Sequence, residues 1–360
     1  MPYSTSIGLD VHARSISAAA CIFETGELVE ATFGYDAEAI AKWAEGLPEP
    51  KAALYESGPT GFDLKRKLDS LGLPCHVGAV SKMRKAPGDR VKTDRRDAAY
   101  LARLLMVGDY VECTPPTPEM EAARDLSRIR EDAREDLMAA RHQLSKMLLR
   151  YGYVWPAGRA SWTKAHRDWL KGIHLPDPTA QYVLEEYMER VRECEARKRR
   201  LDEAIAERAK EEDIAGIVQR LCLLRGISVL SAFGIAAEIG DFARFRTARG
   251  FMSYVGLVPS ECSSGGSVAR GPITKTGNSH VRRLLVEAAW QHSRPLSPAS
   301  DSMQPPEGAS PEAAGIAAKA NMRLHRRSLH LRKHGKKPCV ANVAVARELA
   351  GFVWALALCG

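Results

Sequence analysis

A long series of evenly spaced apolar residues in the middle of the chain limits its fold more than any other feature. Between Glu119 and Arg150 apolar residues recur in steps of three and four, with charged residues between them. The members of the series are Leu126, Ile129, Ala133, Leu137, Ala140, Leu144, Met147 and Tyr151. This heptad-like spacing predicts a continuous helix of about 30 residues, which is about 45 Å long at 1.5 Å per residue.

A second series of the same kind follows after an irregular stretch. Its apolar positions are Leu184, Tyr187, Val191, Cys194, Leu201 and Ile205. Residues 152–178 separate the two series and contain three tryptophans, which are more typical of core anchors than of a surface that stacks on bases. We therefore predict a long helical hairpin or a dimerising coiled coil over residues 116–215, with two helices of an ordinary bundle as the alternative.

The first 115 residues have the pattern of an α/β domain. Three short apolar runs come first, and the turn residues Thr25 and Gly26 separate the last two, which predicts a three-stranded antiparallel meander. Helical and strand patterns then alternate. The predicted strands are 5–11, 15–23, 27–33, 51–55 and 75–80, and the predicted helices are 37–45, 62–71 and 93–107. Three hairpin strands followed by alternating helices and strands are typical of the ribonuclease-H arrangement.

Residues 216–360 are predicted to form a compact, mostly helical domain. Within it a loop rich in small residues spans 259–277. Residues 295–315 are rich in Ser, Pro and Ala, which predicts a flexible insertion. Residues 319–337 carry many Arg and Lys residues and no acid, before a final helix at 340–358.

The charge balance and the cysteines narrow the class of protein. The 360 residues include 52 Lys and Arg against 44 Asp and Glu, a net charge of +8, so a polyanion is the first partner to consider. No two of the eight cysteines have the spacing of a zinc knuckle. The chain has neither the pattern of a signal peptide nor an unbroken apolar run of about 18 residues, so we expect a cytoplasmic protein with no membrane partner.

Four acidic residues form the strongest candidate site. Asp10 and Glu56 each stand where a predicted strand ends, and Asp94 and Asp97 are three apart on a predicted helix and share a face. If the two strands are neighbours, all four carboxylates converge at one edge of the sheet. Their repulsion would cost several kcal/mol in a partly buried site unless divalent cations offset it. Two hard cations with oxygen ligands are typical of in-line displacement at phosphorus, so we predict a metal site for a phosphodiester substrate.

Basic residues crowd around the aspartate pair. They are Lys82, Arg84, Lys85, Arg90, Lys92, Arg95, Arg96 and Arg103. A basic rim around an acidic centre gathers a nucleic-acid backbone while metal ions hold the phosphate that is cut. The alternative is an ordinary solvated charged face.

A second candidate site lies in the C-terminal third of the chain. The loop Glu261–Ser267 is rich in Ser and Gly, so it offers nucleophilic hydroxyls and room for a ligand to approach the backbone. No histidine–aspartate pair stands out as a base, so an activated serine here would need metal ions or neighbouring carboxylates. An ordinary Gly/Ser loop is the alternative. Predicted nucleic-acid contacts in this part are Arg270, Lys275, Arg282, Arg283, Arg323, Arg326 and Arg327.

These motifs, in this order, resemble those of the DEDD-type insertion-sequence transposases, also known as bridge-RNA-guided recombinases. In the first half the resemblance rests on Gly8-Leu9-Asp10, on Glu56 followed by Ser57-Gly58-Pro59-Thr60-Gly61, and on Lys92-Thr93-Asp94-x-x-Asp97-Ala98. In the second half it rests on Gly256-Leu257-Val258-Pro259, Ser263-Ser264-Gly265-Gly266 and Ile273-Thr274-Lys275-Thr276-Gly277-Asn278. It extends over nearly the whole chain.

The resemblance implies a RuvC-like nuclease domain at 1–115, an oligomerising coiled coil at 116–215 and a transposase domain at 216–360. It implies that Asp10, Glu56, Asp94 and Asp97 bind two Mg²⁺ ions, or Mn²⁺, and that Ser264 is the nucleophile. The serine would form a phosphoserine link with DNA and free a 3′-hydroxyl for strand exchange. Further implications are a structured noncoding guide RNA that pairs with donor and target DNA, and a bacterial dimer of dimers with a composite active site.

Three other functions fit part of the pattern. A hydrolytic, structure-specific DNA nuclease of the Holliday-junction resolvase type would use metal-activated water and form no covalent intermediate. An actin-like sugar kinase or ATPase would need a Gly/Thr-rich loop directly after Asp10, which Val11-His12-Ala13-Arg14 does not supply. A non-catalytic nucleic-acid scaffold would not require the four acids.

Overall fold

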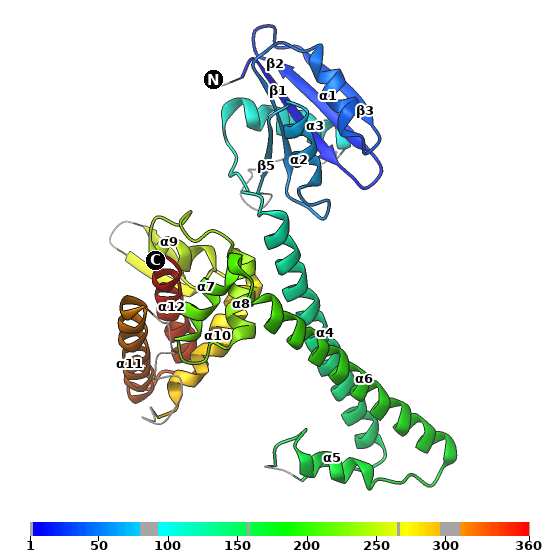
Figure 1. Ribbon diagram of the computed structural model, residues 1–360, viewed down its shortest axis with the longest axis vertical. Coiled ribbons are helices and arrows are strands. Elements are labelled where there is room, and N and C mark those ends of the chain that lie inside the picture. Colours follow the sequence, from blue (N-terminus) through cyan, green and yellow to red (C-terminus); the bar gives the residue numbers. More distant parts are fainter. Residues whose placement is uncertain (1–2, 80–92, 157–158, 265–266, 296–309, 360) are drawn as a thin grey trace. The chain divides into compact units, whose positions relative to one another are not determined.

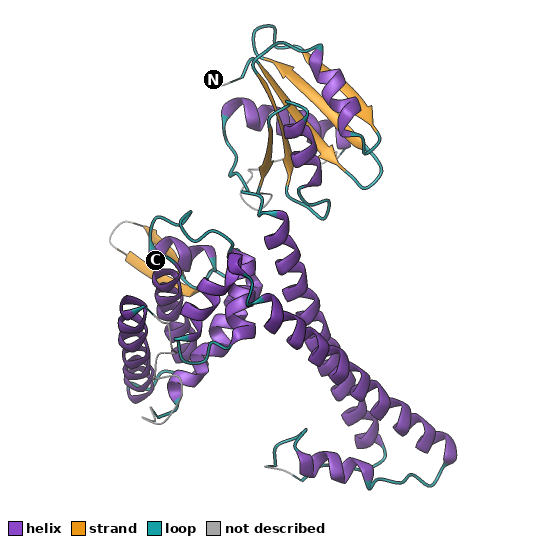
Figure 2. Ribbon diagram, viewed as in Figure 1, coloured by secondary structure: helices purple, strands orange, loops and turns teal. Residues whose placement is uncertain are grey.

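The computed structural model describes most of the chain, which divides into two compact units (Figure 1). The described residues are 3–79, 93–156, 159–264, 267–295 and 310–359. The first unit spans residues 1–115 and the second spans residues 116–360. The first is a mixed α/β unit and the second is mostly helical (Figure 2).

The first unit is built on a five-stranded sheet with the order β3-β2-β1-β4-β5. The strands are β1 (Thr5–Val11), β2 (Ile16–Ile22), β3 (Leu28–Phe33), β4 (Lys51–Glu56) and β5 (Cys75–Gly78). Strands β1, β2 and β3 are antiparallel neighbours, whereas β4 runs parallel to β1 and β5 parallel to β4. The predicted meander is confirmed, and the order and directions are consistent with a ribonuclease-H-like sheet.

Helices cover both faces of this sheet. Helices α1 (Ala37–Glu45) and α2 (Asp63–Ser70) lie on one face, where Leu9 and Tyr55 pack in the same core cluster as Ile40 and Leu64. Helix α3 (Asp94–Val107) lies on the other face, where Ala52 and Leu54 of β4 pack against its leucines. Because side chains alternate along a strand, even-numbered residues of β1 and β4 face α3.

Strand β1 and helix α3 approach each other very closely at Gly8. A Cβ atom on Gly8 would lie 2.0 Å from the carbonyl oxygen of Ala98 and 2.4 Å from the backbone nitrogen of Ala102. No L side chain fits such a gap, and backbone atoms of a helix cannot move aside as a flexible side chain can. The glycine of the Gly8-Leu9-Asp10 motif is therefore required for packing, and it brings the start of α3 to the end of β1.

We expect Gly8→Ala to destabilise the first unit by at least the upper end of the about 1–3 kcal/mol typical of overpacked cores, because the added methyl group meets backbone. Urea unfolding followed by tyrosine fluorescence and circular dichroism measures this loss. Gly34→Ala is the matched control, since a Cβ at Gly34 meets no atom within 4 Å. Equal unfolding midpoints for the two variants would contradict the close contact.

The second unit begins with a long helical hairpin. Helix α4 (Pro118–Arg150) and helix α6 (Pro178–Arg208) each begin with Pro after a capping residue, Thr117 or Asp177, whose side chain accepts a backbone N–H of the first turn. The two helices run antiparallel. Cross-helix pairs follow in reversed order, from Arg130–Asp202 to Asp136–Arg197 and Arg141–Glu195. The helical hairpin is thus observed, and a coiled coil between subunits stays a prediction.

An aromatic cluster closes the end of the hairpin at helix α5 (Lys164–Lys171). The ring of His166, which is 5% exposed, lies 5.0–5.5 Å from the rings of Trp155, Trp162 and Trp169. The guanidinium of Arg141 covers Trp162 at 4.5 Å. These contacts are those of core anchors, the interpretation favoured from the sequence.

Most of the remaining elements pack around one core. Its largest buried side chains include Phe233, Phe251, Leu285, Leu349 and Val353. The elements are α7 (Glu212–Cys222), α8 (Val229–Ile239), α9 (Ala248–Tyr254), β6 (Pro259–Ser264), β7 (Ser267–Ile273), α10 (Ser279–Ala289), the 3₁₀ helix η2 (Trp290–Ser293), α11 (Pro311–Lys333) and α12 (Pro338–Ala357).

Among the described residues, one helix is long and apolar enough to cross a membrane by length and composition, namely α12. Its residues Leu349, Val353 and Leu356 are fully buried in the core of the second unit. Such burial is typical of a core helix.

Two local predictions differ from the structure. The predicted loop 259–277 contains the antiparallel hairpin β6–β7, in which Glu261 pairs with Arg270. The predicted insertion 295–315 is too long at its C-terminal end. Ser310 caps α11, which begins at Pro311 and carries the basic segment up to Lys333 as part of a helix. Residues 296–309 lie outside the described part of the chain.

Candidate metal centre

The end of β1 and the end of β4 form one edge of the sheet. Leu9 pairs with Tyr55 in parallel register, so Asp10 and Glu56 occupy the next positions on adjacent strands. Both have even numbers and therefore belong to the face that α3 covers. The condition on which the convergence of these two acids depends, that their strands are neighbours, is met.

The first turn of α3 contributes the other two acids. Thr93 caps the helix by accepting the backbone N–H of Arg96, and Asp94 and Asp97 follow. Each lies four residues before a residue that packs on the sheet, Asp94 before Ala98 and Asp97 before Leu101. Residues four apart share a helix face, so both carboxylates continue the buried stripe of α3 to the edge of the sheet.

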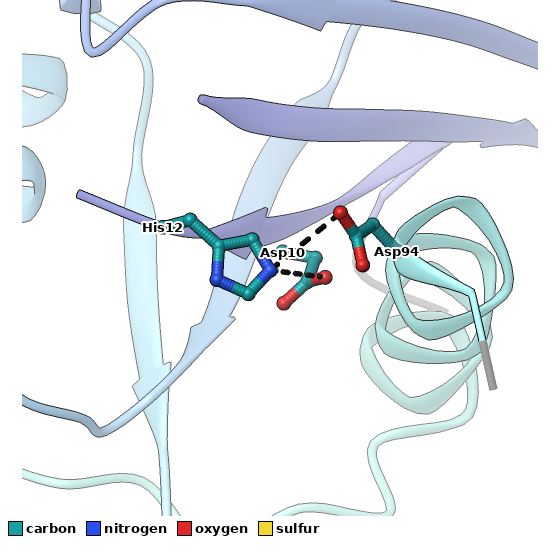
Figure 3. A group of neighbouring side chains, drawn as sticks. All are labelled: Asp10, His12 and Asp94. Carbon is teal, nitrogen blue, oxygen red and sulfur yellow. Dashed lines mark ion pairs between the residues drawn. The ribbon is translucent and has the colours of Figure 1, made fainter. Parts of the chain in front are cut away.

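Asp10, His12 and Asp94 point toward one another (Figure 3). Nε2 of His12 lies 3.3 Å from Oδ2 of Asp10 and 3.7 Å from Oδ2 of Asp94. One ligand atom from each of the three residues lies within 4.8 Å of the others. Oδ2 of Asp10 is buried and has no hydrogen-bond partner of good geometry in the described part of the chain. A buried carboxylate oxygen in this position, with His12 as its neighbour at 3.3 Å, suits a bound cation.

The electrostatics of the cluster also favour a bound cation. Burial raises the pKa of Asp10 above its usual value, His12 opposes that shift, and the charges of Asp94 and Asp97 raise the pKa further. The protein therefore holds a carboxylate where its ionised form is unfavourable. A divalent cation would supply the missing positive charge, and the two carboxylates and one imidazole are donors that such ions accept.

Glu56 and Asp97 lie at the margin of this cluster. The charge of Asp97 raises the pKa of Asp10. The pKa of Tyr100 on α3 is raised mainly by burial, and the charge of Glu56 contributes to this shift. Glu56 is exposed and is not one of the three residues whose ligand atoms lie within 4.8 Å. The structure thus brings Asp10 and Asp94 together, with Asp97 beside them and Glu56 on the adjacent strand.

His12 is the residue that the sequence analysis missed. The available signal is its spacing: His12 follows Asp10 by two and directly follows β1, and extended backbone places residues two apart on the same side.

The predicted basic rim is described only in part. Arg95 and Arg96 are exposed in the first turn of α3. Lys82, Arg84, Lys85, Arg90 and Lys92 lie outside the described residues.

The predicted serine lies at the end of β6. Ser264 pairs with Ser267 at the last position of the β6–β7 hairpin before its tip. The side chains of Ser264 and Arg270 lie outside the described part of the structure.

Several predicted nucleic-acid contacts are engaged within the fold. Arg282 donates to the backbone oxygens of Val255 and Thr276, and burial lowers its pKa. Other ion pairs join Arg283 to Glu131 and Glu287, and Arg323 and Arg327 to Glu348. Lys275 and Arg326 are exposed, with no ion pair among the described residues.

Comparison with known proteins finds family matches in both halves of the chain. A family model described as "Transposase IS116/IS110/IS902 family" matches residues 218–302, and a DEDD transposase model of IS110 type matches residues 7–153. A putative transposase of Sinorhizobium fredii, y4qE, is 43% identical over 303 residues, which cover 84% of this chain and 74% of the relative. The transposase of insertion sequence element IS1533 from Leptospira borgpetersenii is 31% identical over 345 residues, 92% of this chain and 97% of the relative.

Proposed function

This chain belongs to the IS116/IS110/IS902 family of insertion-sequence transposases, which act on DNA, and on that premise we propose that it is an RNA-guided recombinase whose first unit binds Mg²⁺. Asp10 and Asp94 are the central ligands in this proposal, and Asp97 and Glu56 complete the set. The observation that carries it is the buried oxygen of Asp10, which lies within 4.8 Å of a second carboxylate and an imidazole.

Asp10 and the residues around it have distinct roles in this site. Asp10 and Asp94 would hold the cation, which, when bound, offsets the negative charge that develops on a phosphate under attack. Gly8 keeps α3 close enough for Asp94 to reach Asp10. Arg95 and Arg96, on the same turn, would attract the DNA backbone toward the acids.

We assign the nucleophile to Ser264. Its oxygen forms a bond to a DNA phosphorus while the bond to the 3′-oxygen breaks, and the hydroxyl proton ends on that 3′-oxygen. The products are a phosphoserine link and a free 3′-hydroxyl, so the number of phosphodiester-type bonds is unchanged and no ATP is needed. Support comes from the position of Ser264 next to the tip of a hairpin and from the neighbouring glycines.

The partners in this proposal are donor DNA, target DNA and a structured noncoding guide RNA. The charge of +8 and the basic helix α11 favour polyanion binding. A dimer of dimers would bring the acidic site of one subunit to the serine hairpin of another, and the α4–α6 hairpin is the segment we assign to assembly.

The proposal is tested by purifying the protein from a host that carries the flanking element DNA and sequencing the RNA that co-purifies. We expect one RNA from the element, and strand exchange between donor and target DNA only when that RNA and Mg²⁺ are both present. Strand exchange by RNase-treated protein would contradict RNA guidance, and strand exchange in excess EDTA would contradict the metal site.

The surface of α11 gives a further prediction. Arg326→Ala should weaken nucleic-acid binding and reduce the slope of log K against log salt by about 0.7–0.9, one phosphate contact, because Arg326 is exposed and has no ion pair among the described residues. Arg323→Ala should change the slope less, since Arg323 already pairs with Glu348. Fluorescence anisotropy at several salt concentrations measures both, and an unchanged slope for Arg326→Ala would remove α11 from the binding surface.

A further inference from the structure

A buried carboxylate in the second unit has no part in the chemistry described so far. Glu238 is the acidic residue of the apolar helix α8, and its side chain is 2% exposed. It accepts two hydrogen bonds from Arg128 of α4, at 2.8 and 3.1 Å, and one from Nδ2 of Asn278 at 2.7 Å. Nδ1 of His280 lies 3.4 Å away.

These donors keep Glu238 ionised. Burial alone would raise its pKa, but the hydrogen bonds from His280, Arg128 and Asn278 lower the pKa to about 2. An ionised group buried at this depth is stable only while its partners stay in place. Glu238 therefore fixes the positions of residues from α4 and from the start of α10 with respect to α8.

Asn278 connects this carboxylate to the root of the β6–β7 hairpin, which we define as residues 256–258 and 274–277. Its Oδ1 accepts the backbone N–H of Val281 as the cap of α10, while its Nδ2 donates to Glu238. The residues just before it, Thr274 and Lys275, donate their backbone N–H groups to Val258 and Gly256 at the entry to the hairpin.

The hairpin root is packed tightly on both sides. A Cβ on Gly256 would lie 2.3 Å from the oxygen of Thr276, and one on Gly277 would lie 1.8 Å from the oxygen of Tyr254. Lys275 has a φ of 55°, in the left-handed region that is strained for a residue with a side chain. A backbone held in this way has little freedom to adjust, so the direction of the hairpin follows the position of Asn278.

We propose that Glu238 is a positioning residue for strand cleavage: through Asn278 it sets the direction of the β6–β7 hairpin, and with it the position of Ser264, relative to α4 and α8. This inference rests on the proposed role of Ser264. The hydrogen bonds of Glu238 are not enclosed in the core, because Glu238 and its partners Arg128, Asn278 and His280 line an open hollow of about 520 Å³.

The length of the hairpin makes its direction critical. Six residues of β6, Pro259–Ser264, span about 20 Å at 3.3–3.4 Å per residue. A rotation of about 5° at the root of a lever of about 20 Å moves its end by about 1.7 Å. Since a displacement of about 1 Å can lower the rate of an in-line reaction about 100-fold, a loose root is sufficient to stop cleavage without unfolding the protein.

The test uses two variants of the full-length protein in its RNA complex. Glu238→Gln removes the charge at nearly constant volume. Asn278→Ser retains a good cap for α10 but cannot reach Glu238, so it breaks the connection even if Glu238→Gln folds poorly. Asp132→Asn is the matched control, because it removes a carboxylate from the same hollow and Asp132 is exposed, with no ion pair among the described residues.

We expect both variants to lower the maximal rate of DNA–protein adduct formation at saturating DNA at least about 100-fold, with an unchanged Kd for DNA. In hydrogen–deuterium exchange, the amides of Thr274 and Lys275 should exchange at least about tenfold faster, while α12 keeps its protection. The control should match the unmodified protein in both measurements.

Unchanged exchange at residues 274–281 in both variants would overturn the proposal, as would a uniform rise over the whole unit, which indicates general destabilisation. The exchange measurement does not depend on the chemistry. If Ser264 is not the nucleophile, Ser264→Ala still forms the adduct. The exchange rates at residues 274–281 then still show whether Glu238 holds the hairpin root.

Discussion

Asp10→Asn is expected to lower the rate of DNA strand cleavage at least about 1,000-fold while leaving RNA binding unchanged. The loss corresponds to about 4 kcal/mol of transition-state stabilisation, the size expected when a metal ion that offsets charge at phosphorus is lost. Cleavage of end-labelled donor DNA in Mg²⁺ measures the rate. Glu24→Gln, at an exposed turn of the same unit, is the control.

The same substitution should stabilise the protein in the absence of metal. Burial and the neighbouring aspartates raise the pKa of Asp10, so its ionised form costs folding free energy above its usual pKa, and that cost is absent in Asn. Conversely, Mg²⁺ or Mn²⁺ should raise the melting temperature of the unmodified protein and not that of Asp10→Asn. Full cleavage activity of Asp94→Asn in Mg²⁺ would be incompatible with the proposed centre.

Ser264→Ala is expected to abolish the covalent DNA–protein adduct, with a loss of at least about 10,000-fold in strand exchange, because no other group replaces the attacking oxygen. Denaturing gel electrophoresis of radiolabelled DNA after proteolysis detects the adduct, and mass spectrometry assigns its site. Ser263→Ala is the matched control, since it removes the adjacent hydroxyl and should retain the adduct.

Two outcomes would change the assignment of mechanism. Loss of the adduct in Ser263→Ala but not in Ser264→Ala would move the nucleophile by one residue. Metal-dependent cleavage with no adduct in the unmodified protein, accompanied by incorporation of ¹⁸O from water into the product phosphate, would indicate hydrolysis and favour a nuclease of the resolvase type.

The parts of the fold that follow from local periodicity could be predicted from the sequence. The strand pattern of residues 5–33 predicts the observed meander, and the three- and four-residue steps after Leu126 predict the observed long helix. Ala133, Leu137, Ala140, Leu144 and Met147 of that series are buried, whereas Ile129 is exposed and Tyr151 lies just after the end of α4. The position of Asp10 beside Glu56 depends on one further assumption, that their two strands are neighbours, and the structure meets it.

Features that depend on three-dimensional contacts could not be predicted in the same way. Residues Glu261–Ser264 have no alternating apolar pattern, so the sequence predicts a loop where the structure has the β6–β7 hairpin, whose pairing with residues 267–270 is visible only in the fold. The role of Glu238 depends on Arg128, 110 residues earlier in the chain. Its signal was an isolated acid in the otherwise apolar segment Val229–Ile239, where a charge is stable only with partners.

The contact at Gly8 has a consequence for protein engineering. Backbone atoms of β1 and α3 are in direct contact there, so any segment exchanged for β1 must keep a glycine at position 8. A chimera that changes DNA-cleavage properties should therefore retain Gly8, and libraries that vary this position should yield mostly misfolded first units.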